Sequence, residues 1–453
     1  MTNSPRAARL TRLRASNPED RDRFRALTRR AIGADAEVET RAQAIVSDVK
    51  RRGDVAVREH TESIEGRSPG PHGYEIVPDE RARRAAAVDP EVRAALERAG
   101  ARIRAFHEAQ TENGYSAHGG AARLRVVPHR RVGLYAPGGT ARYPSSVLMT
   151  AIPAEVAGVD EIVLVTPDAS PEALAAADIA GVSRVFELGG AQAIAALAFG
   201  TEAVPRVDKI AGPGNAWVTA AKRAVYGEVD IDALAGPSEV LIIADESAEP
   251  RYVAADLLAQ AEHDTDARPL LFTTSEPIID AVEAEIERQL GGLSRREVAA
   301  EAIARHGIGL VTGSANEALA LAEEYAPEHL ELAVKDASRL AETVRAAGAV
   351  FVGHHTPEAA GDYIAGPNHV LPTGGAARFS SPLGAYDFRK RISILELDRD
   401  GLAELRRDIG HLARVEGLDA HARSVEARFE PAGDSAADEG DGTAPEAEPG
   451  RAE

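Results

Sequence analysis

The chain has 453 residues, which is enough for two or three domains with separate hydrophobic cores. Its 72 acidic residues outnumber its 52 lysines and arginines, and the net charge of -20 argues against nucleic-acid binding, because neutralising phosphates requires basic surfaces. The sequence contains no cysteine, which excludes disulfide bonds, cysteine-bound zinc and a catalytic thiolate.

Hydropathy and charge also indicate the cellular compartment of the protein. No apolar run approaches the roughly 20 residues of a membrane-spanning helix, and the basic N-terminal segment lacks the apolar core of a secretory signal. We therefore expect a cytoplasmic protein. Arginine supplies nearly all of the positive charge, which together with the acidic excess suggests either a high-salt cytoplasm or a GC-rich genome.

The first part of the chain is rich in charged helical patterns. Residues 1–30 are expected to form a charged, partly helical arm. From about 35 to 110, apolar residues recur at helical spacing among charges and predict helices, as in VETRAQAIVSDVKRRGDVAVREH.

Short apolar strands then alternate with helices along most of the remaining chain. The expected strands are first EIVLVTP, RVFELGG and DKIAGPGN, and after LAGPSE they are EVLIIAD, ARPLLFTTS, GIGLVTG and GAVFVG. This alternation predicts an α/β fold with two doubly wound (Rossmann-like) domains, because buried strands joined by crossover helices form parallel sheets.

These patterns divide the chain into five expected parts. Residues from Pro431 onward are strongly acidic and lack large apolar side chains, so we expect them to be disordered. The full division is an N-terminal arm (1–30), a large α/β domain (31–134 plus 237–383), an inserted α/β domain (135–236), a C-terminal helical extension (384–430) and the acidic tail (431–453).

Three glycine-rich loops follow expected strands and precede helices: YAPGG (135–139), LGGAQ (188–192) and GPGN (212–215). Glycine allows the backbone to approach a phosphate, and a helix N-terminus favours negative charge. None is a GxGxxG or Walker sequence, and each alone is an ordinary tight turn. Three such loops at one end of one sheet favour a crevice for a nucleotide.

A set of distant polar residues could form a metal site. Gln260 and His263 lie one helical turn apart in the helix-like run RYVAADLLAQAEHD, so both should point from one helix face. Asp362 could add a carboxylate and His421 a second imidazole, a nitrogen and oxygen set that suits zinc. Each residue alone is more often an ordinary surface residue, and spacing cannot unite positions so far apart.

The adjacent Glu328 and His329, in YAPEHLEL, suit general acid/base chemistry. One side chain is acidic and the other can be neutral near pH 7. The alternative is a capping glutamate beside a surface histidine.

Taken together, these motifs resemble the histidinol dehydrogenases. The matching segments keep their order over roughly 35–430 and are GLYAPGGTARYPSS, ELGGAQAIAALAFG, KIAGPGNAWV, AGPSEVLIIAD, LLAQAEHD, YAPEHLEL, GDYIAGPNHVLPTGGAARFSSPLG and EGLDAHARSV. Two departures are Leu234, where proline is common, and Ala385-Tyr386, in place of a more acidic stretch. Neither departure falls on a motif residue.

The resemblance implies oxidation of L-histidinol to L-histidine through histidinal, the last two steps of histidine biosynthesis, with two NAD+ used in succession. It implies a homodimer that exchanges C-terminal segments, so that Glu416 and His421 reach the site of the other subunit. The residues implied for zinc are Gln260, His263, Asp362 and His421, and those implied for acid/base catalysis are Glu328 and His329. The residues implied for substrate are Ser238, Gln260, His263, His329, Asp362, His369, Glu416 and His421. The residues implied for NAD+ are Tyr135, Gln192 and Asn215.

Three other functions can be compared with the oxidation of histidinol. A family relative could oxidise another primary alcohol, such as a sulfonated diol, but His369, Glu416 and the zinc set favour histidinol. A non-catalytic zinc protein would not need Glu328 and His329 together. A zinc hydrolase would leave the three glycine-rich loops unexplained.

The lack of cysteine also constrains the mechanism, since no thiol can trap the aldehyde covalently. The remaining route is hydration of the aldehyde followed by a second hydride removal. We expect His329 to take the alcohol proton in the first oxidation. We expect Glu328, through water or His329, to activate water for the second.

Overall fold

The computed structural model describes residues 8–28, 35–138, 143–167 and 169–430. The chain forms two compact units, one comprising Met1–Glu112 with Val126–Lys390 and the other Asn113–Arg125 with Arg391–Glu453. The predicted acidic tail (431–453) lies outside the described residues. None of the described helices combines the length and the hydropathy needed to cross a membrane.

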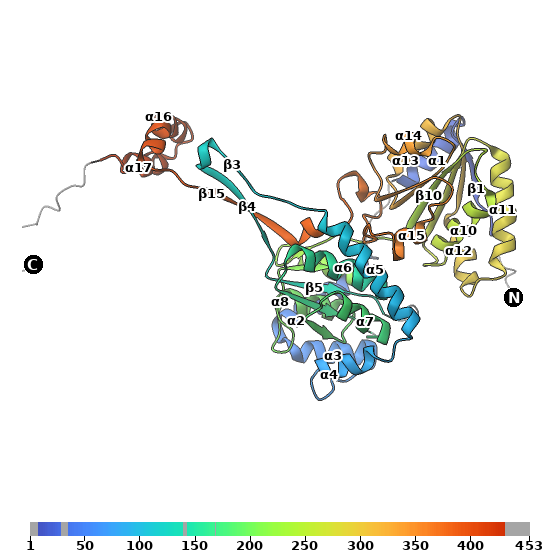
Figure 1. Cartoon of the computed structure of the whole chain (residues 1–453), viewed down its shortest axis with the longest axis horizontal. Helices are drawn as coiled ribbons and strands as arrows, with labels where there is room; N and C mark the ends of the chain where they lie inside the picture. The colour runs from blue at the N-terminus through green and yellow to red at the C-terminus, as the bar shows by residue number, and fades with distance from the viewer. Residues whose placement is uncertain (1–7, 29–34, 139–142, 168, 431–453) are drawn as a thin grey trace, which may run out of the picture. The chain divides into compact units, whose positions relative to one another are not determined.

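The first sheet of the larger unit has six parallel strands in the order β1-β12-β11-β10-β13-β14 (Figure 1). Its strands are β1 (Thr11–Arg14), β10 (Glu239–Ala244), β11 (Arg268–Thr273), β12 (Ile308–Val311), β13 (His329–Ala333) and β14 (Ala349–Val352). Its helices are α1 (Pro18–Thr28), α10 (Pro250–Ala261), α11 (Glu276–Leu290), α12 (Arg296–His306), α13 (Ala315–Tyr325), α14 (Ala337–Ala341) and α15 (Glu358–Tyr363). Successive residues of β10 belong to two different core clusters, so both faces of this sheet are buried.

The second sheet of this unit has the order β2-β7-β6-β5-β8-β9, with only β2 antiparallel. Its strands are β2 (Glu75–Ile76), β5 (Arg131–Tyr135), β6 (Glu161–Val165), β7 (Arg184–Phe186), β8 (Lys209–Ala211) and β9 (Asp230–Ile231). Its helices are α2 (Ala36–Arg52), α3 (Asp54–Glu65), α4 (Pro78–Ala85), α5 (Pro90–Glu108), α6 (Pro144–Ala157), α7 (Pro171–Ile179), α8 (Gly190–Phe199) and α9 (Ala216–Val225). Two doubly wound sheets confirm the predicted fold class.

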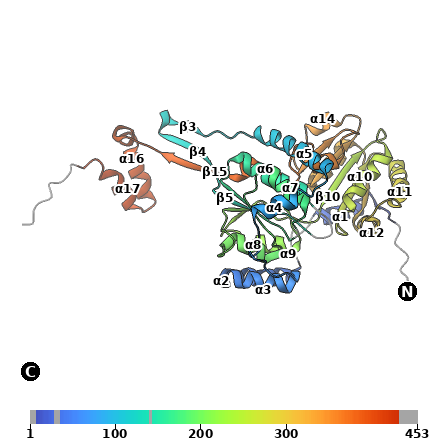
Figure 2. The same ribbon diagram turned by 60° about the horizontal axis from the view of Figure 1, so that its bottom comes forward.

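The boundary of the second domain differs from the prediction. Residues 31–134 were assigned to the domain that carries the metal and acid/base residues, but α2 and α3 pack beneath α8 and α9 (Figure 2), and α5 packs on α6 and α7. Ile45, Val46 and Val49 bury the apolar face of α2 in the core of the second sheet. Helices α2, α3 and α5, within residues 36–108, therefore pack with the second sheet and not with the first.

The N-terminal segment also differs from the predicted arm. Strand β1 pairs with β12 at the edge of the first sheet, from Thr11 opposite Ile308 onward. Phe24 of α1 is fully buried and its ring centroid lies 5.4 Å from that of Phe272. The segment is an edge strand and a covering helix of the first sheet, because Leu10, Leu13 and Phe24 bury there.

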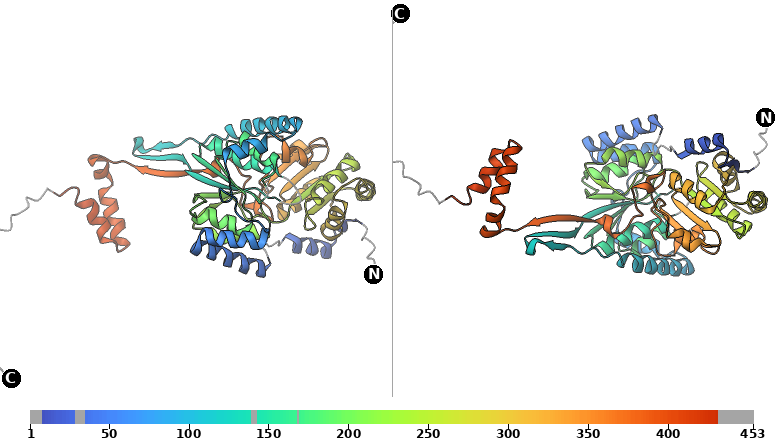
Figure 3. Two further views of the ribbon diagram at one scale, coloured as in Figure 1. Left: turned by 90° about the horizontal axis from the view of Figure 1, so that it is seen from below. Right: turned by 90° about the horizontal axis from the view of Figure 1, so that it is seen from above.

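The smaller unit carries the predicted C-terminal helical extension. Strands β3 (Tyr115–Ala117), β4 (Ala122–Pro128) and β15 (Arg389–Leu395) form a sheet in the order β15-β4-β3. Helices α16 (Arg399–Val415) and α17 (Asp419–Glu426) pack side by side at the red end of the chain (Figure 3), and bury Ala413 and Ala422.

Candidate active site

The acid/base pair lies at the amino edge of the first sheet, where β10 and β13 begin. Ala326 ends α13 in the left-handed conformation (φ 51°), which turns the chain into Pro327 and Glu328. Glu328 and His329 are 6 % and 4 % exposed, respectively. Such burial matters because it removes water from two groups that can each take up or release a proton.

Glu328 is held in a fixed position by the neighbouring strand. Its Oε2 accepts a hydrogen bond of 2.8 Å from the backbone N–H of Glu239, and the hydroxyl of Ser238 donates a second hydrogen bond to the carboxylate. Burial raises the pKa of Glu328 well above its usual range, and the nearby carboxylates of Glu239 and Asp362 raise it further. The side chain is therefore a stronger base than an exposed glutamate.

His329 has a defined tautomer. Its Nδ1–H donates to the backbone oxygen of Glu239 at 3.0 Å, which leaves Nε2 as the unprotonated nitrogen. Nε2 is buried without a hydrogen-bond partner among the described residues and lies 3.8 Å from Oδ1 of Asp362. Because burial lowers the pKa of His329 to about 4, the ring is neutral near pH 7 and Nε2 can accept a proton.

Metal-type ligands converge beside this pair. Gln260 is fully buried in the last turn of α10, and both polar atoms of its amide lack a partner among the described residues. Ligand atoms of His263, Asp362 and Glu358 lie within 4.8 Å of one another. Burying an amide without hydrogen-bond partners normally costs about 1–3 kcal/mol of folding free energy. A role as a metal ligand therefore explains the buried position of Gln260 better than packing does. This nitrogen and oxygen set fits zinc.

The geometry of the first two of these ligands corrects one prediction. Helix α10 ends at Ala261, so His263 does not share a helix face with Gln260. The chain instead makes a turn in which the N–H of His263 donates to the backbone oxygen of Gln260 at 3.2 Å.

Glu358 was not predicted as a site residue. It begins α15, one turn before Asp362, and its Oε1 lies 3.6 Å from Nδ1 of His329. Its Oε2 is buried without a partner among the described residues. The signal that could have revealed it is the i, i+4 spacing of two carboxylates in EAAGD.

His369 joins the same site from the loop after α15. Its Nδ1–H donates to the backbone oxygen of Asp362 at 2.7 Å, and its Nε2 lies 3.4 Å from Oγ of Ser146 on α6. Burial lowers the pKa of His369, so this imidazole is also neutral near pH 7. The structure thus gathers Ser238, His263, Glu328, His329, Asp362 and His369, and Gln260 precedes His263 by one turn of the chain.

The three predicted cofactor residues lie at the carboxyl ends of strands in the second sheet. Tyr135 ends β5, and its hydroxyl accepts a hydrogen bond of 3.3 Å from the N–H of Gly190. Gln192 is buried in the first turn of α8 and donates through Nε2 to Glu65 at 2.8 Å. Asn215 caps α9, where its Oδ1 accepts from two backbone N–H groups. The predicted alignment of the glycine-rich loops at one sheet edge is confirmed.

Glu416 and His421 belong to the smaller unit. Glu416 follows the last residue of α16, and His421 lies in α17. Both side chains are exposed in that unit. Their roles at the site stay predictions.

The two doubly wound sheets and the buried Glu328-His329 pair define a protein of the α/β class with a candidate site for proton transfer. Comparison with known proteins makes the assignment specific. A family model described as histidinol dehydrogenase matches residues 28–429. The chain belongs to the histidinol dehydrogenase family.

Individual relatives agree with this assignment. The chain is 51% identical over 399 residues to a histidinol dehydrogenase of Syntrophotalea carbinolica, covering 86% of this chain and 93% of the relative. It is 47% identical over 422 residues to a histidinol dehydrogenase of Aquifex aeolicus, covering 93% and 99%. The crystal structure of histidinol dehydrogenase from Elizabethkingia anophelis superposes with a TM-score of 0.85 at 35% identity, covering 93% of this chain and 98% of that one.

Proposed function

We propose that this protein oxidises L-histidinol to L-histidine through histidinal, with zinc and two NAD+, in the last two steps of histidine biosynthesis. The observation that carries the proposal is the buried neutral His329, whose unpartnered Nε2 faces Asp362 beside the orphaned amide of Gln260. An unprotonated base and a set of metal-type ligand atoms lie near one another there, and a zinc-assisted oxidation of an amino alcohol uses both.

Gln260, His263 and Asp362 would hold the zinc ion, with His421 as the fourth ligand. When bound, zinc would supply positional chemistry by gripping the imidazole and amino nitrogens of the substrate and so presenting its CH2OH group. Ser238, His369 and Glu416 would complete the substrate contacts. Glu358 lies close enough to Asp362 and His263 to orient them.

Tyr135, Gln192 and Asn215 would bind NAD+, which accepts the hydride in each oxidation. The N-termini of α8 and α9 follow the glycine-rich loops, and their free N–H groups favour a pyrophosphate. This placement at the carboxyl edge of a doubly wound sheet supports a nucleotide site.

The proton steps follow from the two buried side chains. Nε2 of His329 would accept the hydroxyl proton while hydride leaves the carbon of the alcohol. Glu328, with its raised pKa, would remove a proton from the water that hydrates histidinal. The hydrate then transfers its second hydride to NAD+ and releases its two hydroxyl protons to the solvent, which leaves a carboxylate by a route that needs no cysteine.

We also propose a cytoplasmic homodimer in which the smaller unit supplies Glu416 and His421 to the other subunit. Large apolar side chains on the smaller unit support this arrangement. Leu412 is 66% exposed and Val415 is 86% exposed, which is unusual for side chains that remain in water. A second subunit would cover them.

The test follows NADH absorbance with L-histidinol, with and without a zinc chelator. The proposal predicts two NADH for each histidinol, lost on chelation and restored by zinc. NADH from a sulfonated diol but not from histidinol would favour the relative that oxidises another alcohol. Zinc binding with no NADH from either alcohol would contradict an oxidoreductase role.

A further inference from the structure

A cavity lies at the carboxyl edge of the first sheet, opposite the candidate active site at the amino edge. Its volume is about 230 Å³, far above the roughly 10–15 Å³ that one water needs. It opens between the start of α10, the end of β13 and the loop from Gly353 to Pro357. Strands β10 and β13 are neighbours here, where the strand order reverses, which is where doubly wound sheets bind ligands.

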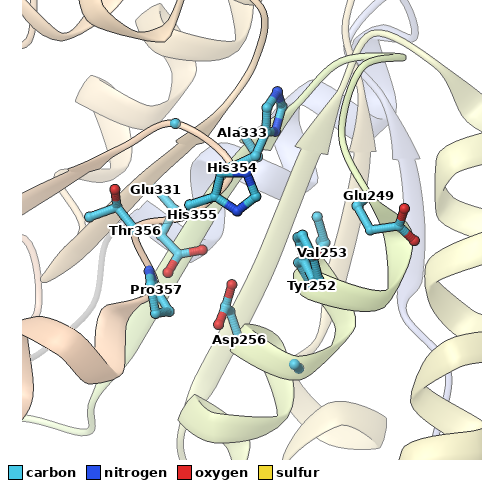
Figure 4. Close-up of a pocket in the computed structure, with 12 residues that line it drawn as sticks. Glu249, Tyr252, Val253, Asp256, Glu331, Ala333, His354, His355, Thr356 and Pro357 are labelled. Carbon is cyan, nitrogen blue, oxygen red and sulfur yellow. The ribbon is translucent and has the colours of Figure 1, made fainter.

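The inner end of the cavity is formed by two carboxylic acids. Asp256 of α10 and Glu331 of β13 share a side-chain hydrogen bond, and Figure 4 shows their carboxyl groups facing one another. Burial raises the pKa of Asp256 to about 6 and that of Glu331 well above its usual range. A hydrogen bond between two carboxyl groups needs a proton on one of them; Oε1 of Glu331 also accepts from the N–H of Glu358 at 2.8 Å, and the remaining oxygens can accept further hydrogen bonds.

His354 adds a further acceptor. The hydroxyl of Ser247 donates its proton to Oδ1 of Asp245, so its oxygen must accept from Nε2–H of His354, 3.2 Å away. In the neutral ring Nδ1 of His354 is the nitrogen that can accept, and it is buried without a partner among the described residues. His354 lies in the cavity wall above the carboxyl pair (Figure 4).

The remaining wall is apolar or acidic. Val253, Ala333 and Pro357 supply apolar surface, and Glu249 adds a third carboxylate to the lining. Among the described residues that line the cavity there is neither lysine nor arginine. The nearest guanidinium on α10, that of Arg251, is stacked 5.0 Å from the ring of Tyr252 and does not line it.

We propose that this cavity binds a small primary alkylammonium ion. Its N–H groups would donate to the carboxyl pair and to Nδ1 of His354, and its alkyl part would lie on the apolar wall. The site does not depend on the proposed oxidation. Its floor is nevertheless shared with the active site, since Asp256 lies one helical turn before Gln260 on α10, and Glu331 lies two residues after His329 on β13.

The test is calorimetric titration of n-butylammonium chloride into the full chain at neutral pH, with n-butanol as the uncharged control. Asp256→Asn removes the negative charge. Ala255→Phe fills the opening from an exposed position of α10 without removing any polar group. Gln260→Met serves as the matched variant of the active site. NADH production from histidinol is recorded separately and reports only on the proposed function.

We expect one saturable site for butylammonium and none for butanol. Loss of a hydrogen bond to a charged group should weaken binding about ten- to a hundredfold in Asp256→Asn, and Ala255→Phe should abolish it. Gln260→Met should leave the affinity unchanged. Any other pattern overturns the proposal: no saturation with the unaltered chain, equal binding of butanol, affinity kept in either cavity variant, or affinity lost in Gln260→Met.

Discussion

The two sheets of the larger unit share one winding pattern but place their candidate functional residues at opposite edges. In the second sheet, glycine-rich loops follow the carboxyl ends of β5, β7 and β8, near the strand at which the order reverses. In the first sheet, Glu328 and His329 lie at the amino edge instead. Strand order therefore indicates where a ligand crevice is expected, whereas buried polar groups indicate where proton transfer is predicted.

The largest expected effect concerns the amino edge of the first sheet. His329→Gln removes the unprotonated Nε2 and should lower kcat by about 10²–10⁴-fold, the usual contribution of a general base. Steady-state NADH production measures it, with the exposed His72→Asn as control. An unchanged kcat in His329→Gln would show that another residue is the general base. The amino edge of the first sheet would then not be the place of proton transfer.

The orphaned amide of Gln260 predicts opposite effects on metal binding and on stability. Gln260→Met should strip zinc and activity. The metal-free variant should gain about 1–3 kcal/mol in free energy of unfolding, because two unpartnered buried atoms disappear. Metal analysis and chemical denaturation of the chelator-treated protein measure both effects. Zinc retained at full occupancy would remove Gln260 from the ligand set.

Glu328→Gln should separate the two half-reactions. Water activation is needed only after the aldehyde forms, so the rate from histidinal should fall more than the rate of the alcohol step. Single-turnover measurements started from histidinol and from histidinal compare the two. An equal loss in both would show that Glu328 has no special part in hydration.

At the carboxyl edge of the second sheet, Asn215 can be tested for two separable roles. Asn215→Ala should cost about 1 kcal/mol of stability, because the cap of α9 is lost. Asn215→Asp keeps an accepting oxygen and should keep stability, yet it should raise KM for NAD+ by placing a carboxylate near phosphate. If KM stays constant in Asn215→Asp, the residue is a helix cap only.

The smallest effect concerns His107, which joins α5 to the loop that carries His369. Its Nδ1–H donates to the backbone oxygen of Ile103 at 2.8 Å, and its Nε2 accepts from Asn368 at 3.3 Å. Burial lowers the pKa of His107 below its ordinary 6.5. As the pH falls below that value, the unfolded chain takes up the proton first, so the folded state loses stability until its own lower pKa is reached.

His107→Gln should lack this contribution. The free energy of unfolding of the unaltered protein, relative to the variant, should therefore decline between about pH 7 and pH 5. Denaturant titrations across that range measure the difference. If the free energies of unfolding of the two proteins depend on pH in the same way, the pKa of His107 is the same in the folded and unfolded states.

Local patterns predicted β6, β7, β8, β10, β11, β12 and β14 and many of the helices beside them, because alternating buried strands and amphipathic helices are visible in the sequence, but they did not predict β13. They did not show which sheet a helix covers. The apolar face of α2 predicts burial, but only pairing over a long distance in sequence brings it to α8 and α9. The short edge strand β1 was missed for the same reason, since its partner β12 lies nearly 300 residues away.

The site could be predicted only in part. The family resemblance suggested Gln260, His263 and Asp362 as joint ligands, whereas spacing alone could not unite α10 with α15. The tautomer of His329 depends on the backbone oxygen of Glu239, a contact between strands that no motif encodes. Glu358 was overlooked because a glutamate at a helix start usually faces water, and its burial is set by β13.

We propose above all that a zinc ion binds beside the neutral His329 at the amino edge of the first sheet. Anomalous diffraction at the zinc absorption edge, from crystals grown with histidinol, locates such an ion. We expect one peak per subunit, bonded to Gln260, His263 and Asp362, with the substrate hydroxyl facing Nε2 of His329. A peak bonded to other residues, or none in zinc-loaded crystals that contain histidinol, would contradict it.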